Sequence, residues 1–187
     1  MSATPAIRHD LRPGDLGAIV AHHGVTYLPE YDLDSTFEAH VGAGVTAAGK
    51  RGFPGERERL WIVELGGRHA GSLALTDEGD DLGAVRWFVL DRALRGRGLG
   101  RRLIGELLDH ARADGYRGLW LETFSDLSTA AAIYRSYGFR VVSEDHSPRW
   151  GRERFTYQRY ELSLQDLAQS SSRASTGSSS RPFSVSA

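Results

Sequence analysis

The sequence predicts an α/β fold with a mixed central sheet of about seven strands, flanked by about four helices. Three observations support this fold class. Helix-like and strand-like segments alternate along the chain. Two segments in the second half carry apolar residues at helical spacing. Short apolar runs elsewhere are bounded by glycine-rich turns, as strands are.

The first half of the chain predicts two helices and three strands. A short strand is expected over residues 6–10, and Asp15 is expected to cap a helix that runs to about Tyr27. A second helix is expected from Ser35 to about Ala48, with its apolar residues four positions apart. Strands are expected over residues 60–65 and 70–76, joined by a Gly-Gly hairpin turn.

The second half predicts two more helices and four more strands. A largely buried strand over residues 84–90 precedes a helix over 101–114, which Gly115 ends. A strand over 118–124 precedes a helix over 128–137, stopped by Gly138. The last two strands are expected over residues 139–143 and 155–162.

Composition and charge limit the possible classes of protein. The 187 residues include no cysteine, which excludes disulfides, thiolate metal sites and a cysteine nucleophile. The net charge of −1 gives no general affinity for nucleic acid or an acidic membrane. No apolar run is long enough for a transmembrane helix, and the N-terminus does not resemble a signal peptide, so a cytoplasmic location is expected.

The domain organisation is expected to be simple. Residues 1–165 are predicted to form one domain, and residues 166–187 are predicted to form a disordered tail. Most of that segment is serine-rich and has few apolar residues to bury, so burial would not offset the entropy lost on ordering.

The sequence from Phe88 to Arg102 is the most informative segment. An apolar strand leads into an arginine- and glycine-rich turn, which opens the helix predicted over 101–114. Free N–H groups in the first turn of a helix, together with glycines that allow close approach, form an anion site. A pyrophosphate is the expected anion, although a basic surface turn is an alternative interpretation.

Two other phosphate motifs fit the sequence poorly. The dinucleotide fingerprint fails because Arg101 stands where a third glycine or alanine belongs. Residues 44–50 have the spacing of a P-loop, but Arg51 replaces the serine or threonine that binds magnesium, and no strand precedes them.

The segment Arg95-Gly96-Arg97-Gly98-Leu99-Gly100 resembles the Q/R-x-x-G-x-G/A turn of the GCN5-related N-acetyltransferase (GNAT) family. Tyr134, with Gly138-Phe139 after it, resembles the Tyr-x-x-x-Gly-Phe segment of the same family. The resemblance runs from about residue 7 to 162 and implies a GNAT fold. More narrowly, the chain is similar to the acetyltransferase half of bacterial MarR/GNAT fusions.

The resemblance implies a site for acetyl-CoA, bound as a co-substrate, and no metal. The pantetheine arm would lie along the strand at residues 88–90, and the turn at 95–101 would hold the pyrophosphate. The implied cofactor-binding residues are Phe88, Val89, Leu90, Arg95, Gly96, Arg97, Gly98, Leu99, Gly100, Arg101, Ser128 and Tyr134. Relatives often carry an asparagine where this chain has Leu127, so Ser128 or Thr129 is expected to replace it or to cap the helix.

The resemblance also implies catalytic roles. Tyr134 would protonate the leaving thiolate, although it also belongs to the apolar stripe of its helix. Glu122 is the candidate base for the amine, because a charge within an apolar strand is costly unless it is paired or functional. A salt bridge to an arginine is the alternative. The N–H of Leu90 would stabilise the oxyanion.

Candidate acceptor residues are Tyr27, Glu30, Tyr31 and Trp150, each with a packing or surface role as the alternative. His22 and His23 do not predict a metal site. Adjacent residues of a helix point to different faces, and no histidine or carboxylate completes a zinc site at the usual spacing. His146 is expected to lie in a loop.

The expected function is therefore transfer of acetyl from acetyl-CoA to a primary amine of a small molecule or peptide, by direct attack in a ternary complex. The alternative is a regulatory module that binds acyl-CoA without turnover. No nucleic-acid or membrane partner is expected, and the chain is expected to be a monomer or a homodimer. The acceptor itself stays open at this point.

Overall fold

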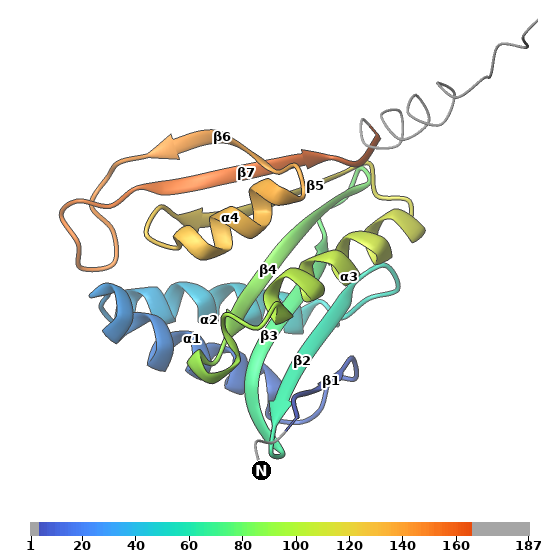
Figure 1. Ribbon diagram of the computed structural model, residues 1–187, viewed down its shortest axis with the longest axis horizontal. Helices are drawn as coiled ribbons and strands as arrows, with labels where there is room; N and C mark the ends of the chain where they lie inside the picture. Colours follow the sequence, from blue (N-terminus) through green and yellow to red (C-terminus); the bar gives the residue numbers. More distant parts are fainter. Residues whose placement is uncertain (1–3, 166–187) are drawn as a thin grey trace, which may run out of the picture.

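The computed structural model describes residues 4–165 and confirms the predicted fold class (Figure 1). The predicted tail lies outside the described residues. The elements in chain order are β1 (Ala6–Arg8), α1 (Asp15–Tyr31), α2 (Ser35–Lys50), β2 (Arg59–Leu65), β3 (Arg68–Asp77), β4 (Leu82–Leu90), the 3₁₀ turn η1 (Arg92–Leu94), α3 (Leu99–Ala113), β5 (Gly118–Phe124), α4 (Ser128–Ser136), β6 (Arg140–Asp145) and β7 (Tyr157–Ser163). No helix among these residues is long and apolar enough to cross a bilayer.

One seven-stranded sheet, in the order β1-β2-β3-β4-β5-β7-β6, forms the middle layer. Helices α1 and α2 cover one face, and α3 and α4 cover the other (Figure 1). Alternate residues of β2 enter the two cores: Leu60 and Ile62 join the α1–α2 side, whereas Trp61 and Val63 join the α3–α4 side. Because both faces are covered, the sequence of β2 reads as a continuous apolar run.

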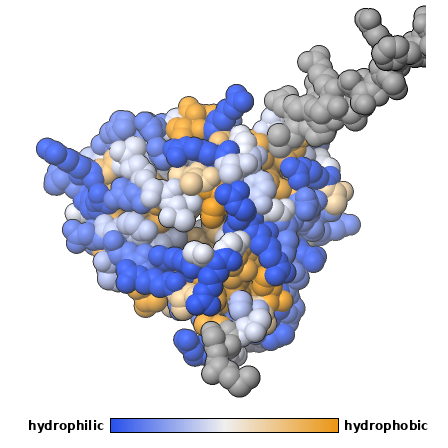
Figure 2. Space-filling model, viewed as in Figure 1, coloured by the Kyte–Doolittle hydropathy of each residue, from blue (hydrophilic) through white to orange (hydrophobic). Residues whose placement is uncertain are grey.

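The outer surface contrasts with these two cores. The face shown in Figure 2 is mostly hydrophilic, with apolar side chains gathered in small patches between charged ones. The edge strand β6 is exposed along its whole length, and Val142 on it is 53% exposed. The apolar residues that specify the fold are therefore mainly inside the two helix-covered layers.

Strands β4 and β5 pair in parallel at one end only. Their register joins Leu82–Ala84 to Gly118–Trp120, and the described pairing stops there. Beyond this point the two strands diverge towards α1 and α2 (Figure 1). The edge of β4 between Val85 and Leu90 is therefore left without a β5 partner. Side chains reach two of its carbonyls, those of Phe88 and Leu90, and a ligand strand could pair along the rest of the edge.

A bulge interrupts β4 beside this opening. Ser72 pairs with Val89 and Ala74 pairs with Arg86, so two β4 residues oppose Leu73 alone. Trp87 has a φ of 49°, in the left-handed region that aromatic residues rarely adopt. The Ser72 hydroxyl donates a 2.7 Å hydrogen bond to the Trp87 carbonyl and stabilises this conformation.

Two sequence expectations need correction, and the poor fit of the P-loop motif is explained. Helix α1 continues through Pro29 to Tyr31 rather than ending near Tyr27. Gly14, not Asp15, is its N-cap; the Asp15 carboxylate instead binds the Arg8 guanidinium at 2.5 Å. The segment 44–50, with its P-loop spacing, lies inside α2, so it does not form a phosphate-binding loop.

Candidate functional site

The glycine-rich turn adopts the conformation that the sequence requires of it. Gly96 and Gly98 have φ values of 72° and 79°, which only glycine adopts readily. Gly98 is the N-cap of α3 and offers no side-chain hydrogen bond to the helix. The N–H groups of the first turn of α3 are therefore free to bind an anion.

A third glycine, Gly100, allows α3 to begin close against the sheet. A Cβ at this position would lie 3.2 Å from Cζ of Phe88 and 3.3 Å from Cδ1 of Ile133. Both distances are tighter than ordinary van der Waals contacts, so a larger residue would displace the helix from β4.

A cavity of about 480 Å³ lies beside this turn, and we call it the turn cavity. It is bounded by β4, the turn, the start of α3 and the start of α4, together with two tyrosines of α1. Its lining residues are Tyr27, Tyr31, Phe88, Val89, Leu90, Arg95, Gly96, Gly98, Gly100, Arg101, Asp126, Leu127, Ser128, Thr129, Ala130 and Ile133.

Most of the predicted cofactor-binding residues meet at the turn cavity. The exceptions are Arg97 and Leu99, which line a separate depression, and Tyr134, which lines the cavity described below. Leu127 lines the turn cavity in place of the expected asparagine, with Ser128 and Thr129 beside it. Leu127, rather than Ser128, is the N-cap residue of α4, and it makes no side-chain cap.

The arginines of the turn have partners within the protein. Arg95 donates to the Leu90 carbonyl at 2.9 Å and to Glu30 at 2.8 Å, and Arg92 donates to Glu30 at 2.6 Å. Burial alone would raise the pKa of Glu30, but the hydrogen bonds from Arg95 and Arg92 outweigh it and hold that pKa below its ordinary value. Glu30 therefore joins the end of α1 to the turn, and Arg97 stays exposed.

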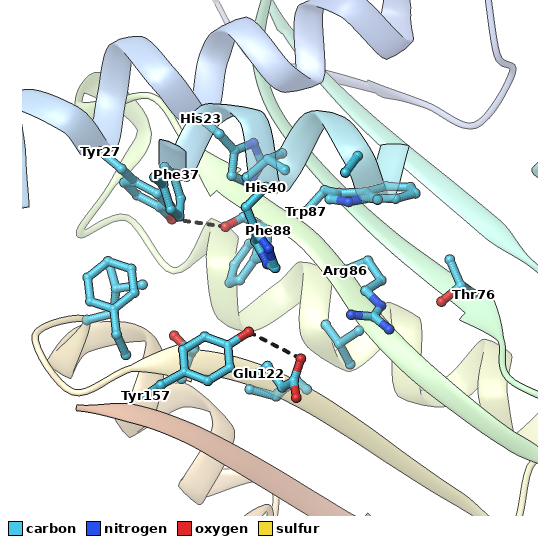
Figure 3. Close-up of a pocket in the computed structure, with 18 of the residues that line it drawn as sticks. His23, Tyr27, Phe37, His40, Thr76, Arg86, Trp87, Phe88, Glu122 and Tyr157 are labelled. Atoms are coloured by element: carbon cyan, nitrogen blue, oxygen red, sulfur yellow. Dashed lines mark hydrogen bonds between the residues drawn. The ribbon is translucent and has the colours of Figure 1, made fainter. Parts of the chain in front are cut away.

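A second cavity of about 410 Å³ lies where β4 and β5 diverge, and we call it the strand cavity (Figure 3). Residues of α2, β4, β5, α4 and the chain between β6 and β7 line it. Tyr27, Phe88, Leu127 and Ala130 line both cavities, so the two adjoin beside the bulged strand.

Tyr134 lines the strand cavity and also belongs to the core. It is 5% exposed, and its ring lies 6.0 Å from that of Phe139 and 6.4 Å from that of Phe88. Burial raises the pKa of its phenol well above the ordinary value, so the hydroxyl keeps its proton at neutral pH. A proton donor in that position is therefore chemically available.

Glu122 differs from the expectation of a charge within a buried strand. Its side chain is exposed on the wall of the strand cavity, where it accepts a 3.2 Å hydrogen bond from Tyr157 (Figure 3). Arg159 stands opposite Glu122 in the register, but its ion pair is with Glu161 at 2.9 Å. The alternative of an arginine salt bridge to Glu122 is therefore not observed among residues 4–165.

The other candidate acceptor residues do not all meet in one cavity. Tyr27 lines both cavities, Trp150 lines the strand cavity and Tyr31 lines the turn cavity. Glu30 instead pairs with Arg95 of the turn. His146 is exposed and hydrogen-bonds Thr156 at 3.2 Å, and it lines neither cavity.

The two adjacent histidines serve the interior. His23 is buried, with its Nδ1 2.8 Å from the Ile19 carbonyl oxygen, and the ring of His22 lies 5.2 Å from that of His69. Within the described part of the chain, no three metal-ligating side chains are grouped as a metal site requires.

Arg86, Trp87 and Tyr157 are among the strand-cavity residues that were not identified from the sequence. The bulge at Trp87 places two consecutive side chains, Arg86 and Trp87, on the cavity wall, which regular alternation forbids. No local pattern indicates that bulge, although an arginine within an apolar strand was a usable signal.

Known proteins resemble this chain over segments of different lengths. A 58-residue segment, 31% of the chain, is 53% identical to the uncharacterized protein ML0378 of Mycobacterium leprae and 49% identical to the N-alpha-acetyltransferase RimI of Mycobacterium tuberculosis. These matches span 15% and 35% of the two relatives, so the chain spans well under half of either.

Similar folds occur among solved structures. The Salmonella typhimurium protein yncA, solved with its cofactor acetyl-CoA, has a TM-score of 0.63 and 19% identity, over 87% of this chain and 95% of its own. The model of the acetyltransferase (GNAT) family matches residues 23–139, which include both diverging strands and the glycine turn. Because that match covers more than half of the 187 residues, the chain belongs to the acetyltransferase (GNAT) family.

Proposed function

We propose that this protein is an N-acetyltransferase, which transfers acetyl from acetyl-CoA to a primary amine by direct attack in a ternary complex. One observation carries the proposal: a strand edge without a partner, a free helix N-terminus and a buried tyrosine converge on two adjoining cavities. A thioester at their junction would be reached by an amine from the strand cavity.

The residues present fit acetyl-CoA. The pyrophosphate would accept hydrogen bonds from the N–H groups of the turn and the first turn of α3. The pantetheine arm has amide groups, and it would pair with backbone groups of Phe88 and Leu90, which face the gap left by β5. Arg101 lines the same cavity and adds positive charge, whereas Arg95 is neutralised by Glu30.

The proposed chemistry is a direct acyl transfer. The nitrogen lone pair of the neutral amine attacks the thioester carbonyl carbon, so a C–N bond forms and the carbonyl becomes an oxyanion beside the N–H of Leu90. As the oxyanion collapses, the C–S bond breaks, and Tyr134 donates its proton to the CoA thiolate. Glu122 accepts the proton that the amine loses, directly or through water. Solvent then restores the phenol, and the products are an N-acetyl amine and CoA.

A regulatory module that binds acyl-CoA without turnover is the second candidate. It requires the turn cavity but not the strand cavity, and it gives no role to the Tyr134 hydroxyl. The presence of both Tyr134 and Glu122 in the lining of one cavity favours the enzyme.

Several finer features stay predictions. They are the nearness to the MarR/GNAT fusions, a cytoplasmic location, a small-molecule or peptide acceptor, and a monomeric or homodimeric state.

Calorimetry with acetyl-CoA and with CoA tests the proposal. The informative variant is Gly98→Trp, which would fill the turn cavity. Gly67→Trp is a matched control, since Gly67 also has a positive φ, of 76°, with open space around its Cα, but lies in the β2–β3 hairpin. Micromolar binding that is lost only in Gly98→Trp supports the site. Folded wild-type protein that binds neither ligand contradicts the proposed function.

A further inference from the structure

Arg86 points into the strand cavity because of the bulge that follows it (Figure 3). Its guanidinium carbon lies 4.2 Å from the centre of the Trp120 ring, and a stacked guanidinium is held with its N–H groups pointing outward. Its side chain is 31% exposed. Arg86 therefore presents an oriented cation at the wall of the proposed acceptor site.

The protein itself makes little use of this cation. Within residues 4–165 the side chain of Arg86 donates one hydrogen bond, to Glu78, and that bond is long at 3.5 Å. The same Glu78 oxygen accepts a shorter bond, of 2.7 Å, from the Thr76 hydroxyl. A guanidinium has five N–H donors in a planar fork that matches a carboxylate. Most donors of Arg86 are thus free for a ligand.

The other charges of the cavity form a complementary set. Arg51 is held by Glu58 at 2.7 Å, which leaves Arg86 as the weakly paired cation of the lining. Glu122 is bonded by a neutral phenol and by no cation among the described residues. Glu78 also lines the cavity, but its carboxylate is engaged by the Thr76 hydroxyl and, at 3.5 Å, by Arg86. The cavity therefore offers one carboxylate without a cationic partner, that of Glu122, and one weakly paired guanidinium, which suits a molecule with one ammonium and one carboxylate.

Apolar and aromatic side chains form much of the rest of the wall. Phe37, Val41, Trp87, Phe124 and Trp150 line it, in a cavity of about 410 Å³. That volume lies in the range of small-ligand sites, about 300–1,000 Å³. A long polyamine would need several free carboxylates along its length, whereas Glu78, the second carboxylate of the lining, is already engaged by Thr76 and Arg86.

From this arrangement we infer that the acceptor is a free amino acid with an apolar or aromatic side chain, whose carboxylate binds Arg86 while its amine faces Glu122. This inference rests on the proposed acetyl transfer and names the acceptor class of that site. Arg86 acts as a specificity-determining residue, and the aromatic wall selects the side chain.

The test compares acceptors that differ in one group, with thiol release from acetyl-CoA as the readout. The acceptors are L-phenylalanine, L-phenylalaninamide, phenethylamine and spermidine. We expect kcat/KM for L-phenylalanine to exceed that for its amide by about tenfold or more, because a bidentate ionic hydrogen-bond pair is lost with the carboxylate.

Arg86→Gln separates the carboxylate contact from a general effect on the site. It should raise KM for L-phenylalanine by about tenfold or more and change KM for the amide less than about twofold. Arg86→Lys keeps the positive charge but lacks the planar set of N–H donors. Its KM for L-phenylalanine should lie between those of the wild type and Arg86→Gln. The control is Arg159→Gln: Arg159 stacks on Trp120 at the same 4.2 Å but does not line the cavity, so KM should not change.

Three outcomes overturn the inference: a preference for spermidine or the amide, equal effects of Arg86→Gln on both acceptors, or no acetylation of any of the four by protein that binds acetyl-CoA. Calorimetry with acetyl-CoA shows whether such an outcome contradicts the acceptor class alone or the proposed acetyl transfer as a whole. If acetyl-CoA does not bind, the transferase itself is excluded; if it binds and another amine is acetylated, only the acceptor class is wrong.

Discussion

The hydroxyl of Tyr27 donates a hydrogen bond of 3.1 Å to the carbonyl oxygen of Phe88 (Figure 3). This bond joins α1 to the bulged strand at the point where the two cavities meet. Burial raises the pKa of the Tyr27 phenol, so the donor proton is retained throughout the neutral range. Helix α1 therefore supports the strand that the proposed cofactor would pair with.

Replacing Tyr27 with phenylalanine tests this support. We expect the free energy of unfolding to fall by about 1 kcal/mol, the usual contribution of one hydrogen bond. Acetyl-CoA should bind several-fold more weakly, because Phe88 loses its anchor. Chemical denaturation and calorimetry measure the two effects. Tyr116→Phe is the control, since its buried hydroxyl also donates to a backbone carbonyl, that of Arg57, at 3.1 Å. Equal binding by both variants would show that the Tyr27 bond supports the fold only.

Replacing Tyr134 with phenylalanine should lower kcat by about 10²-fold or more, the range of a general acid, while the Kd for acetyl-CoA stays nearly constant. The ring and its packing are kept, so stability should change little. Steady-state kinetics and calorimetry provide the comparison. Tyr137→Phe is the control, because its hydroxyl donates to the Arg101 carbonyl at 2.9 Å and does not line the strand cavity. A kcat within twofold of the wild type for Tyr134→Phe would remove the tyrosine from the mechanism.

Replacing Glu122 with glutamine should lower kcat/KM at neutral pH by about 10²-fold, because the amide cannot accept the amine proton. The defect should shrink as pH rises, since more of the acceptor is then already deprotonated. A pH profile from neutral to alkaline conditions measures this. Glu161→Gln, on β7 outside the cavity, should follow the wild-type profile. A defect that is constant with pH would assign Glu122 to binding rather than to proton transfer.

Stability should fall as the solution is acidified from about pH 6.5 to about pH 4. Burial lowers the pKa of both His23 and His69 to about 4 from the ordinary 6.5. The unfolded chain therefore binds more protons than the folded one in this window, and the free energy of unfolding decreases as pH falls. His23 contributes at most about 3 kcal/mol, and the partly exposed His69 contributes less because of solvent screening.

The variant His69→Leu checks that assignment. Both ring nitrogens of His69 are buried without hydrogen-bond partners. Leucine therefore removes the titrating imidazole without breaking a hydrogen bond. We expect its unfolding free energy to depend less steeply on pH between 4 and 6.5, as measured by denaturation at several pH values. An unchanged slope would assign the acid sensitivity of this window to other groups, His23 among them.

Local patterns predicted the elements and the turn well. Strand β5 has the predicted bounds, and α3 buries the predicted apolar stripe of Ile104, Leu107, Leu108 and Ala111. The glycine-rich turn was recognisable because positive φ at Gly96 and Gly98 and a helix start are properties of adjacent residues.

The shape of the site depends on residues far apart in the chain. The bulge at Trp87 is stabilised by a hydrogen bond from Ser72, fifteen positions earlier. The turn is held by the ion pair between Glu30 and Arg95, which are 65 positions apart. Glu122 was expected inside a buried strand, but β5 diverges from β4 and leaves its side chain exposed. No segment of sequence contains these relationships.

The sequence by itself determined the order of strands and helices and the conformation of the turn, because periodicity and backbone conformation are properties of neighbouring residues. Only the tertiary structure decided where β4 and β5 separate, that Arg95 is neutralised, and that Arg86 and Glu122 share one cavity. These features follow from pairing register and from the packing of distant side chains, and a single sequence does not specify either one locally.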